Sequence, residues 1–469
     1  MLRTRLCVLF LFSFFINGCF SHVPLYKAPL KEEGEIILYL QPMQQEAHRF
    51  RFLIERVSVI RDDGTDVPLS LSFNELKVSE LVGVQRLLAS GPVPPGSYIG
   101  MTVEFKEAFV RGEEGEAALF VSDKPLTVER QFNVSRREAL TLFLTFRASG
   151  SITDGFHFTP VFSLTTARRG LTNLSGYVSN SGSHYISVFN KKTMQVTGAI
   201  STGMVPQGIV LDQTRGRAYV AASMDSAVEV IDVFREKIVE RITLNLGDEP
   251  LYLALTPDGN ILISVNYGSN TVSIIDANSL FELKRIRVGD GPTSAVVDPL
   301  GLRAYIVNSL SNTLSVVDLS QKEISATIAV EKTPLRGAFN RNGDRLYVIS
   351  RDSPDLFVID PSSLAVTGKI FIGMGALSIK VDTQSGLIYV GSKIGGEISV
   401  IDPSSLMFID TIGIEGTAEF MTIGDEENTL FVVLPDRRLL QKINLVSKKI
   451  MAEIEVGEGA YGVVLMGER

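Results

Sequence analysis

The sequence predicts an all-β protein in which an N-terminal β-sandwich is followed by a seven-bladed β-propeller. Two observations predict the propeller: a phrase of β-type residues that recurs about every 42 residues from residue 172 onward, and a content of 40 Gly and 19 Pro that supplies turns between short strands. A third observation, the lack of a helical-period segment of convincing length, extends the all-β prediction to the residues before the repeat.

The composition excludes several classes of protein. With 45% hydrophobic and 21% charged residues among 469, the chain is neither a disordered tail nor a disulfide-rich miniprotein. Its formal net charge of −8 argues against a nucleic-acid partner, because phosphate binding requires a clustered basic surface.

The first 22 residues predict secretion and lipid anchoring. Two arginines precede an apolar stretch over residues 6–16, which is too short to span a bilayer and is typical of a signal peptide. The following Ile16-Asn17-Gly18-Cys19 resembles a bacterial lipobox, in which the cysteine is lipidated after cleavage. This resemblance implies a signal peptide over residues 1–18 and a membrane anchor at Cys19, with residues 19–33 as the tether.

Lipidation would also leave neither cysteine as a free thiol in the mature protein. Cys7 would leave with the signal peptide and Cys19 would become a thioether, which excludes disulfides, thiolate metal sites and cysteine nucleophiles. Phe20 stands where many inner-membrane lipoproteins carry Asp, which favours the outer membrane. We therefore expect a bacterial cell-envelope protein, exposed on the periplasmic side or at the cell surface.

Residues 34–165 lack the repeat and predict a separate β-sandwich. Their β runs include GEIILYL, FRFLIERVSVI, SYIGMTVEF and ALTLFLTF, and turn residues such as Asp62-Asp63-Gly64 separate them. The segment GPVPPGSYIGMTVEF resembles a bacterial lipoprotein domain of unknown function, a resemblance that implies no activity. Residues 166–173 then form a short connection.

The remaining chain, residues 172–469, reads as seven repeats. Each repeat has one β run with an aromatic or aliphatic anchor residue, and a following β run that ends in Asp or Asn. Aligned across the repeats, the anchors form one column and the Asp or Asn residues a second, and the positions in both columns advance by 42 residues with a single step of 44. The second column comprises Asn190, Asp232, Asp276, Asp318, Asp360, Asp402 and Asn444. Four short strands in about 42 residues form the unit of a propeller blade.

The ends of the array predict how the ring closes. Residues 459–466 match the Pro-led strand that opens the other blades, whereas the first repeat, residues 174–202, has no such strand before it. We expect the C-terminal strand to complete the first blade, which removes free edge strands.

The repeats carry a family resemblance. YVSNSGSHYISVFN, IVNSLSNTLSVVD and YVGSKIGGEISVID are similar to the YVTN type of seven-bladed propeller. The resemblance covers about residues 172–469 and is specific for the fold. It implies several functions, because this repeat occurs in surface-layer proteins, in surface lipoproteins and as a scaffold in some periplasmic redox enzymes.

No motif in the sequence predicts a catalytic residue, a metal site or a cofactor. The four His residues are dispersed, and no zinc or haem motif survives maturation. The Asp column recurs once per blade before turn residues, so we interpret it as accepting backbone hydrogen bonds in turns.

The candidate binding residues lie where single blades depart from their siblings. We expect one face of the propeller, the funnel face, to surround the entrance of the central channel. It should carry the two residues that follow the opening residue of each innermost strand, together with the turn after the next strand. Aromatic and charged side chains there are typical of a binding surface. The candidates are Gln207, Tyr252, Tyr267, Arg336, Arg351, Lys393, Glu419, Phe420, Arg437 and Tyr461.

Two hypotheses about function follow. The first is a non-enzymatic, lipid-anchored protein that binds a protein or glycan of the cell envelope through the funnel face. The alternative is an enzyme or enzyme subunit on the same scaffold, a lactone hydrolase or part of a periplasmic dehydrogenase. Its site would be assembled from Glu419, Asp225 and Asp436, since such enzymes need clustered carboxylates or His.

Overall fold

The computed structural model describes residues 30, 32–43, 45–78, 81, 83–113, 115–167, 169–425 and 428–468. The predicted signal peptide, residues 1–18, and the predicted anchor Cys19 lie outside the described residues. The described chain is built from strands with three 3-10 turns, and none of its segments forms a helix of the length and apolarity that crossing a bilayer requires. The all-β prediction is confirmed.

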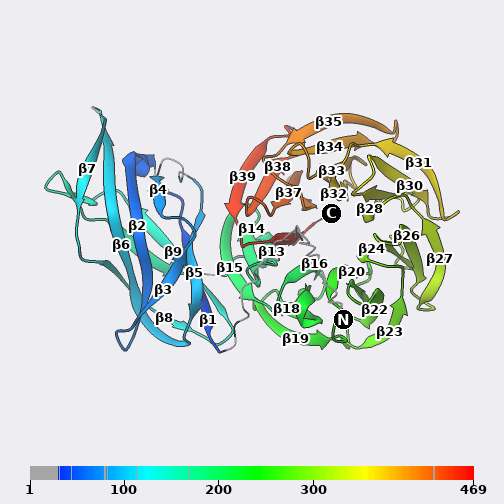
Figure 1. The fold of residues 1–469 in the computed structure, drawn as a ribbon, viewed down its shortest axis with the longest axis horizontal. Helices are drawn as coiled ribbons and strands as arrows, with labels where there is room; N and C mark the ends of the chain where they lie inside the picture. The colour runs from blue at the N-terminus through cyan, green and yellow to red at the C-terminus, as the bar shows by residue number, and fades with distance from the viewer. Residues whose placement is uncertain are drawn as a thin grey trace, which may run out of the picture.

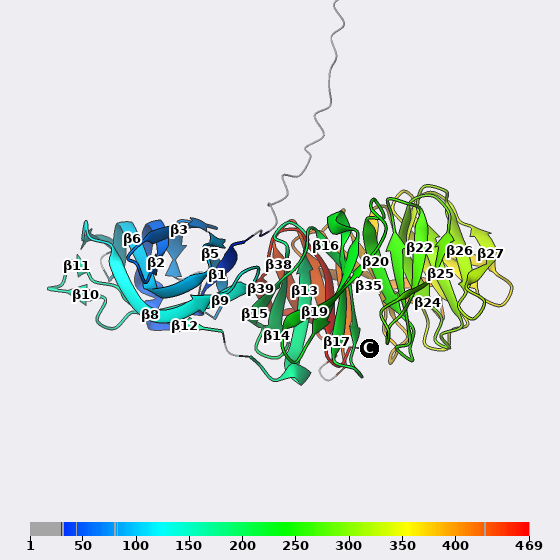
Figure 2. The same ribbon diagram turned by 90° about the horizontal axis from the view of Figure 1, so that it is seen from below.

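The N-terminal region is a sheet of twelve strands beside the propeller ring (Figures 1 and 2). Its strands follow the hydrogen-bonded order β10-β11-β7-β6-β2-β3-β5-β1-β9-β12, with β4 on β2 and β8 on β6. One apolar cluster takes side chains from strands near both ends of this order, such as Phe158 of β11 and Leu164 of β12. The elements are β1 (Gly34–Leu40), η1 (Gln45–Arg49), β2 (Phe50–Arg61), β3 (Asp66–Leu71), β4 (Glu75–Lys77), β5 (Arg86–Val93), β6 (Gly96–Gly112), β7 (Gly115–Val121), β8 (Leu126–Val134), β9 (Ala139–Arg147), β10 (Ile152–Thr153), β11 (His157–Phe158) and β12 (Val161–Thr166).

Strand β1 is buried along its whole length because both of its faces are covered. Ile36 and Leu38 face the core of the N-terminal sheet, whereas the alternate residues Ile37 and Tyr39 pack against the propeller. A strand buried on both faces is expected to be apolar at successive positions, as GEIILYL is.

The propeller has seven four-stranded blades arranged radially (Figure 1). Blade 1 is completed by the last strand of the chain, and each later blade uses four consecutive strands. In blade order the strands and the two 3-10 turns are β40 (Ala460–Leu465), η3 (Thr172–Leu174), β13 (Ser175–Asn180), β14 (Tyr185–Asn190), β15 (Gln195–Ser201); β16 (Pro206–Asp212), β17 (Arg217–Ala222), η4 (Ser223–Asp225), β18 (Ala227–Asp232), β19 (Lys237–Thr243); β20 (Pro250–Leu255), β21 (Ile261–Asn266), β22 (Thr271–Asp276), β23 (Glu282–Arg287); β24 (Pro292–Val297), β25 (Arg303–Asn308), β26 (Thr313–Asp318), β27 (Glu323–Ala329); β28 (Pro334–Phe339), β29 (Leu346–Ser350), β30 (Asp355–Asp360), β31 (Ala365–Phe371); β32 (Ala376–Val381), β33 (Ile388–Ser392), β34 (Glu397–Asp402), β35 (Met407–Gly413); β36 (Phe420–Gly424), β37 (Thr429–Leu434), β38 (Leu439–Asn444) and β39 (Ile450–Glu455).

The ring closes as the sequence predicts. Strand β40 pairs antiparallel with β13, so the first blade has the order β15-β14-β13-β40. Pairing of the last strand of the propeller with β13, its first, covers the edge of β13 and holds the array in a closed circle.

The Asp column stabilises the turn between the third and fourth strands of the blades. In blade 4, Asp318 Oδ1 accepts from the N–H groups of Ser320 and Gln321, at 2.9 Å each. The N–H of Lys322 donates to the Asp318 carbonyl at 2.8 Å. Asn190 and Asn444 make the same side-chain bonds in blades 1 and 7. The column therefore has a structural role.

The N-terminal sheet packs directly on the seam of the ring. The side-chain amide of Gln85 pairs with the backbone of Val196 in β15, donating at 3.3 Å and accepting at 2.7 Å. Glu455 at the end of β39 accepts from Arg86 Nε at 2.9 Å and from the N–H of Leu87 at 3.1 Å, and it also bonds Arg438. The region beside the ring is thus fixed to blades 1 and 7 by apolar contacts and by a buried carboxylate.

Candidate functional site: the central channel

The innermost strands of the seven blades line a central channel, and three of their positions form stacked rings. The upper ring consists, in six blades, of the second residue of the innermost strand and, in blade 7, of the residue directly before β36: Gln207, Leu251, Thr293, Leu335, Leu377, Glu419 and Tyr461. The next position forms the waist ring: Gly208, Tyr252, Ser294, Arg336, Ser378, Phe420 and Gly462. Two residues further on, the lower ring comprises Val210, Ala254, Val296, Ala338, Lys380, Thr422 and Val464.

The waist ring contains one buried cation, Arg336. Arg336 is only 6% exposed, and its two terminal nitrogens donate to Glu419, one to the carbonyl oxygen and one to Oε1 at 2.9 Å. Its guanidinium carbon lies 5.1 Å from the ring centre of Phe420 and 5.5 Å from that of Tyr461. An ion pair and two aromatic rings therefore hold this cation in the middle of the channel.

Small residues of the waist ring make space in the channel for the large side chains of the same ring. Gly208 stands directly beside Tyr252, because a Cβ at Gly208 would lie 2.7 Å from Tyr252 Cα. Ser294 and Ser378 donate to backbone carbonyls of the next blade, at 2.9 and 2.7 Å. Burial raises the pKa of the Tyr252 hydroxyl above its ordinary value of 10.

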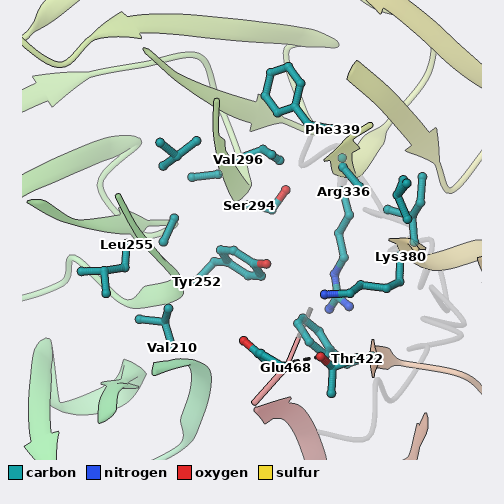
Figure 3. A pocket seen from close by; sticks show the side chains of 18 of the residues that line it. Val210, Tyr252, Leu255, Ser294, Val296, Arg336, Phe339, Lys380, Thr422 and Glu468 are labelled. Atoms are coloured by element: carbon teal, nitrogen blue, oxygen red, sulfur yellow. Dashed lines mark hydrogen bonds between the residues drawn. The ribbon is translucent and has the colours of Figure 1, made fainter. Parts of the chain in front are cut away.

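Two cavities lie along this channel, and Arg336 lines both. The funnel chamber, about 460 Å³, is bounded by all seven residues of the upper ring and by turn residues such as Tyr267 and Arg351. The second chamber, about 380 Å³, is bounded by all seven residues of the lower ring. Figure 3 shows Tyr252, Arg336 and Lys380 directed into the second chamber.

The structure brings together six of the ten predicted binding residues at the funnel chamber. They are Gln207, Tyr267, Arg336, Arg351, Glu419 and Tyr461.

Four predicted residues lie elsewhere. Tyr252 and Phe420 line the second chamber, and Lys393 and Arg437 line neither chamber. Tyr252 was expected on the funnel face and instead lines the second chamber. The register of β20 shifts between Pro250 and Tyr252, so successive residues there do not share one environment. Arg437 instead pairs with Glu415 at 3.7 Å.

The funnel chamber combines exposed apolar and charged side chains. Tyr267, Met224 and Leu310 are exposed large hydrophobic residues of three neighbouring blades. Glu419 is compensated by Arg336, whereas the exposed Arg351 has no ion pair within the described part of the chain. Such a mixture suits a ligand that offers both an apolar surface and a polar group.

The carboxylates of the alternative enzyme hypothesis do not converge. Asp225 pairs with Arg241 at 2.9 Å, Asp436 accepts from the N–H of Thr417 at 3.0 Å, and Glu419 binds Arg336. Among the residues with described positions, no three His, Cys, Asp or Glu side chains are grouped to hold a metal ion. His184 accepts from the N–H of Val205 at 3.1 Å and so has a structural bond.

Sequence reasoning missed the polar residues of the second chamber. Lys380, Thr422 and Glu468 all line it, and Thr422 Oγ1 donates to Glu468 Oε2 at 3.0 Å (Figure 3). The repeat alignment held a signal for Lys380, because the other six blades carry Val, Ala or Thr at that position. No such signal exists for Glu468, which follows the last strand.

Comparison with known proteins agrees with this architecture. Residues 166–468 match the family model described as the YNCE-like beta-propeller. No curated protein matches the chain.

Solved structures resemble the chain at low sequence identity. A functionally unknown protein from Desulfotomaculum acetoxidans DSM 771 is 14% identical, with a TM-score of 0.56 over 62% of this chain and 98% of that one. Dihydro-heme d1 dehydrogenase NirN in complex with DHE is 16% identical, with a TM-score of 0.52 over 64% and 77%. Hydrazine synthase of Kuenenia stuttgartiensis is 18% identical, with a TM-score of 0.50 over 55% and 88%. At such identities the likeness concerns the fold alone.

Proposed function

The chain belongs to the YNCE-like beta-propeller family, and from this premise we propose that it is a lipid-anchored binding protein of the bacterial cell envelope. The funnel chamber is its binding site, and the ligand is a protein or a glycan of the envelope. The observation that carries the proposal is the chamber of about 460 Å³ at one end of the channel, lined by exposed Tyr267, Met224 and Leu310 and by the cation of Arg351, which has no ion pair among the described residues.

The chemistry of this chamber favours binding over catalysis. Tyr and Arg are enriched at binding sites because they supply contact area together with a polar end. A metal centre would need clustered carboxylates or His, whereas Asp225, Glu419 and Asp436 are each bonded to different partners. The lactone hydrolase and dehydrogenase alternatives therefore have less support.

The proposal places the protein at the outer membrane through Cys19, which follows a lipobox-like segment. Residues 34–165 are then a β-sandwich of the lipoprotein type that supports the propeller, residues 172–469. Its packing against blades 1 and 7 suits a rigid support, because both apolar contacts and Glu455 join the two parts.

A capture experiment tests the proposed function. The mature lipoprotein in detergent micelles serves as bait for an envelope extract, next to the double variant Tyr267→Ala/Arg351→Ala and the control Lys393→Ala, which lies outside both chambers. We expect an envelope protein or glycan to be retained by the wild type and the control, and at least about tenfold less by the double variant.

The contrary outcomes are specific. Equal retention by the double variant would remove the funnel chamber from the proposal. A stoichiometric metal in the purified protein, together with hydrolysis of a lactone or ester, would favour the enzyme alternative instead.

A further inference from the structure

The rim of the funnel chamber is one-sided. It comes from the turns after the second strands of blades 2 to 5, which contribute Met224, Tyr267, Leu310 and Arg351. Blades 6, 7 and 1 each contribute only their residue of the upper ring to this chamber. Since blades 2 to 5 are consecutive around the ring (Figure 1), the rim is an arc rather than a full circle. Such an arc fits an elongated ligand better than a compact one.

The arc carries one exposed charge of each sign. Glu249 of blade 3 and Arg351 of blade 5 line the chamber, and both side chains are exposed. Neither takes part in an ion pair among the residues with described positions. The other two charged residues of the chamber, Arg336 and Glu419, pair with each other at 2.9 Å. Glu249 and Arg351 are therefore the charges that can meet a ligand.

Glu249 stands at a position where other blades carry glycine. The residue directly before the innermost strand has a positive φ in blades 1 to 6, and in blades 1, 4 and 6 it is Gly, which this conformation favours. Blades 2, 3 and 5 instead carry Val205, Glu249 and Thr333, at φ 57°, 48° and 54°. All three line the funnel chamber. Strained residues of this kind gather at functional sites, which supports a role of these side chains in binding.

Backbone hydrogen bonds connect these strained residues to the rim. The N–H of Tyr267 donates to the carbonyl of Glu249 at 3.2 Å, and the N–H of Arg351 donates to the carbonyl of Thr333 at 3.0 Å. The carboxylate that follows Arg351 in the chain, Asp352, accepts from Thr333 Oγ1 at 2.7 Å. The backbones that carry the exposed carboxylate and the exposed cation are therefore fixed, in two blades that are separated by one.

The two charges together select a class of ligand. A neutral glycan has no ionised group for either residue, and an acidic glycan or a phosphate pairs with Arg351 but is repelled by Glu249. A polypeptide offers side chains of both signs, and apolar ones, at intervals of about 3.3 Å along an extended chain. Blade 4, which lies between blades 3 and 5, contributes the exposed Leu310 as an apolar contact. The arc is therefore complementary to a polypeptide.

We propose that the funnel chamber binds an extended polypeptide segment that carries a basic side chain at Glu249, an apolar one at Leu310 and an acidic one at Arg351. The segment follows the arc from blade 3 to blade 5. This inference rests on the proposed function, and it narrows the ligand from a protein or a glycan to a protein.

Selection from a displayed library of random twelve-residue peptides on the purified full chain tests the inference. We expect the enriched peptides to share a basic, an apolar and an acidic residue at a fixed spacing. In calorimetry at low ionic strength, a resynthesised peptide should bind Glu249→Gln and Arg351→Gln at least about threefold more weakly than the wild type. Changing its basic residue to Gln should make it bind the wild type and Glu249→Gln equally, since the pair is then already broken.

Two further variants keep the test independent of folding. Lys393 occupies in blade 6 the position of Arg351, because its N–H donates to the Gly375 carbonyl at 2.8 Å, yet it lines neither chamber. Lys393→Gln should therefore leave the affinity for the peptide unchanged. Glu249→Gly introduces the residue that blades 1, 4 and 6 carry, so it should melt no lower than the wild type and still weaken the peptide.

The contrary outcomes separate this inference from the proposed function. It is overturned if no peptide is enriched, if the enriched peptides lack either charge, or if both Gln variants bind like the wild type. An envelope glycan that the wild type retains from a protease-treated extract would also overturn it, while the proposed function stands. Charge-dependent peptides without any retained envelope component would contradict the proposed function and leave the peptide site in place.

Discussion

Arg336 occupies a position that recurs in every blade, and the neighbouring residues determine the space and the ion-pair partner available to it. Four of the other waist-ring residues are Gly or Ser, so the channel has room for three large side chains, of which Arg336 carries the charge. Its partner Glu419 lies 83 residues away in the chain, in blade 7. The repeat predicts where Arg336 stands on its strand, whereas the ion pair requires the closed ring.

The ion pair should matter for stability. We expect Arg336→Gln to lower the free energy of unfolding by about 2–3 kcal/mol, because Glu419 and its carbonyl lose a buried cationic donor. Urea denaturation followed by circular dichroism measures this change. The control Arg351→Gln, which removes an exposed cation without an ion pair in the described chain, should stay within about 0.5 kcal/mol. Equal effects of the two variants would contradict the buried pair.

The turn between the third and fourth strands of the blades could be predicted largely from local sequence. Its bonds join residues two to four apart, so the Asp column and the following polar residues were sufficient to predict it. One feature was not predictable: Lys322, Leu364 and Leu406 close these turns with φ near +55°, a conformation usually taken by Gly. The N–H groups of Lys322 and Leu364 donate to the carbonyl oxygens of Asp318 and Asp360, at 2.8 and 2.9 Å, and hold these two residues there.

The Asp residues in the turns between the third and fourth strands should make the folding stability depend on pH in the acid range. Bonds from backbone and side-chain donors lower the pKa of Asp276, Asp318, Asp360 and Asp402 below the ordinary 3.8. The folded state then binds fewer protons than the unfolded state near that pKa. The stability from these groups is present above pH 3.8 and is lost as pH falls through the lowered folded-state pKa values.

Replacement by Asn separates the charge from the turn. A variant with all four residues changed to Asn should keep its fold, since Asn190 and Asn444 already make the same bonds. It should lose less stability than the wild type between about pH 5 and pH 2 in urea titrations. The reverse change, Asn190→Asp, should steepen that loss. An unchanged acid dependence in both variants would contradict the assignment.

At the scale of the whole molecule, the ring seam and the N-terminal sheet depend on each other. Ile37 and Tyr39 of β1 pack in one apolar cluster with residues of blades 1 and 7. Glu455, 5% exposed, bonds Arg86 and Leu87 of the sheet as well as Arg438 of the ring. The two parts should therefore unfold together.

Removing the buried carboxylate should uncouple them. We expect Glu455→Gln to cost about 3 kcal/mol, because Arg86 and Arg438 lose their shared partner, and to split the calorimetric transition into two. Glu458→Gln is the matched control: it touches the same Arg438 at 3.5 Å but is largely exposed, so its effect should be below about 0.5 kcal/mol. A single unsplit transition in Glu455→Gln would show that the apolar contacts alone couple the two parts.

Ring closure can be tested in the same way. Truncation after Gly457 removes β40, leaves the edge of β13 unpaired, and should abolish the cooperative transition of the propeller. A synthetic peptide of residues 458–468 added in trans should restore the transition, and a scrambled peptide should not. Cooperative unfolding of the truncated chain would contradict a closed ring that depends on β40.

The sequence by itself determined the blades, their number and the closing strand, because these follow from strand alternation, turn bonds and a period that act within about 42 residues. Of the ten candidate residues named from the sequence, six line the funnel chamber. Only the tertiary structure decided that Tyr252 and Phe420 belong to a second chamber, and in β20 the register shifts between Pro250 and Tyr252. Only the tertiary structure showed that Arg336 pairs with Glu419, 83 positions away, and that Arg86 pairs with Glu455, 369 positions away. The physical reason is that contacts between blades and between domains arise from packing rather than from any local pattern.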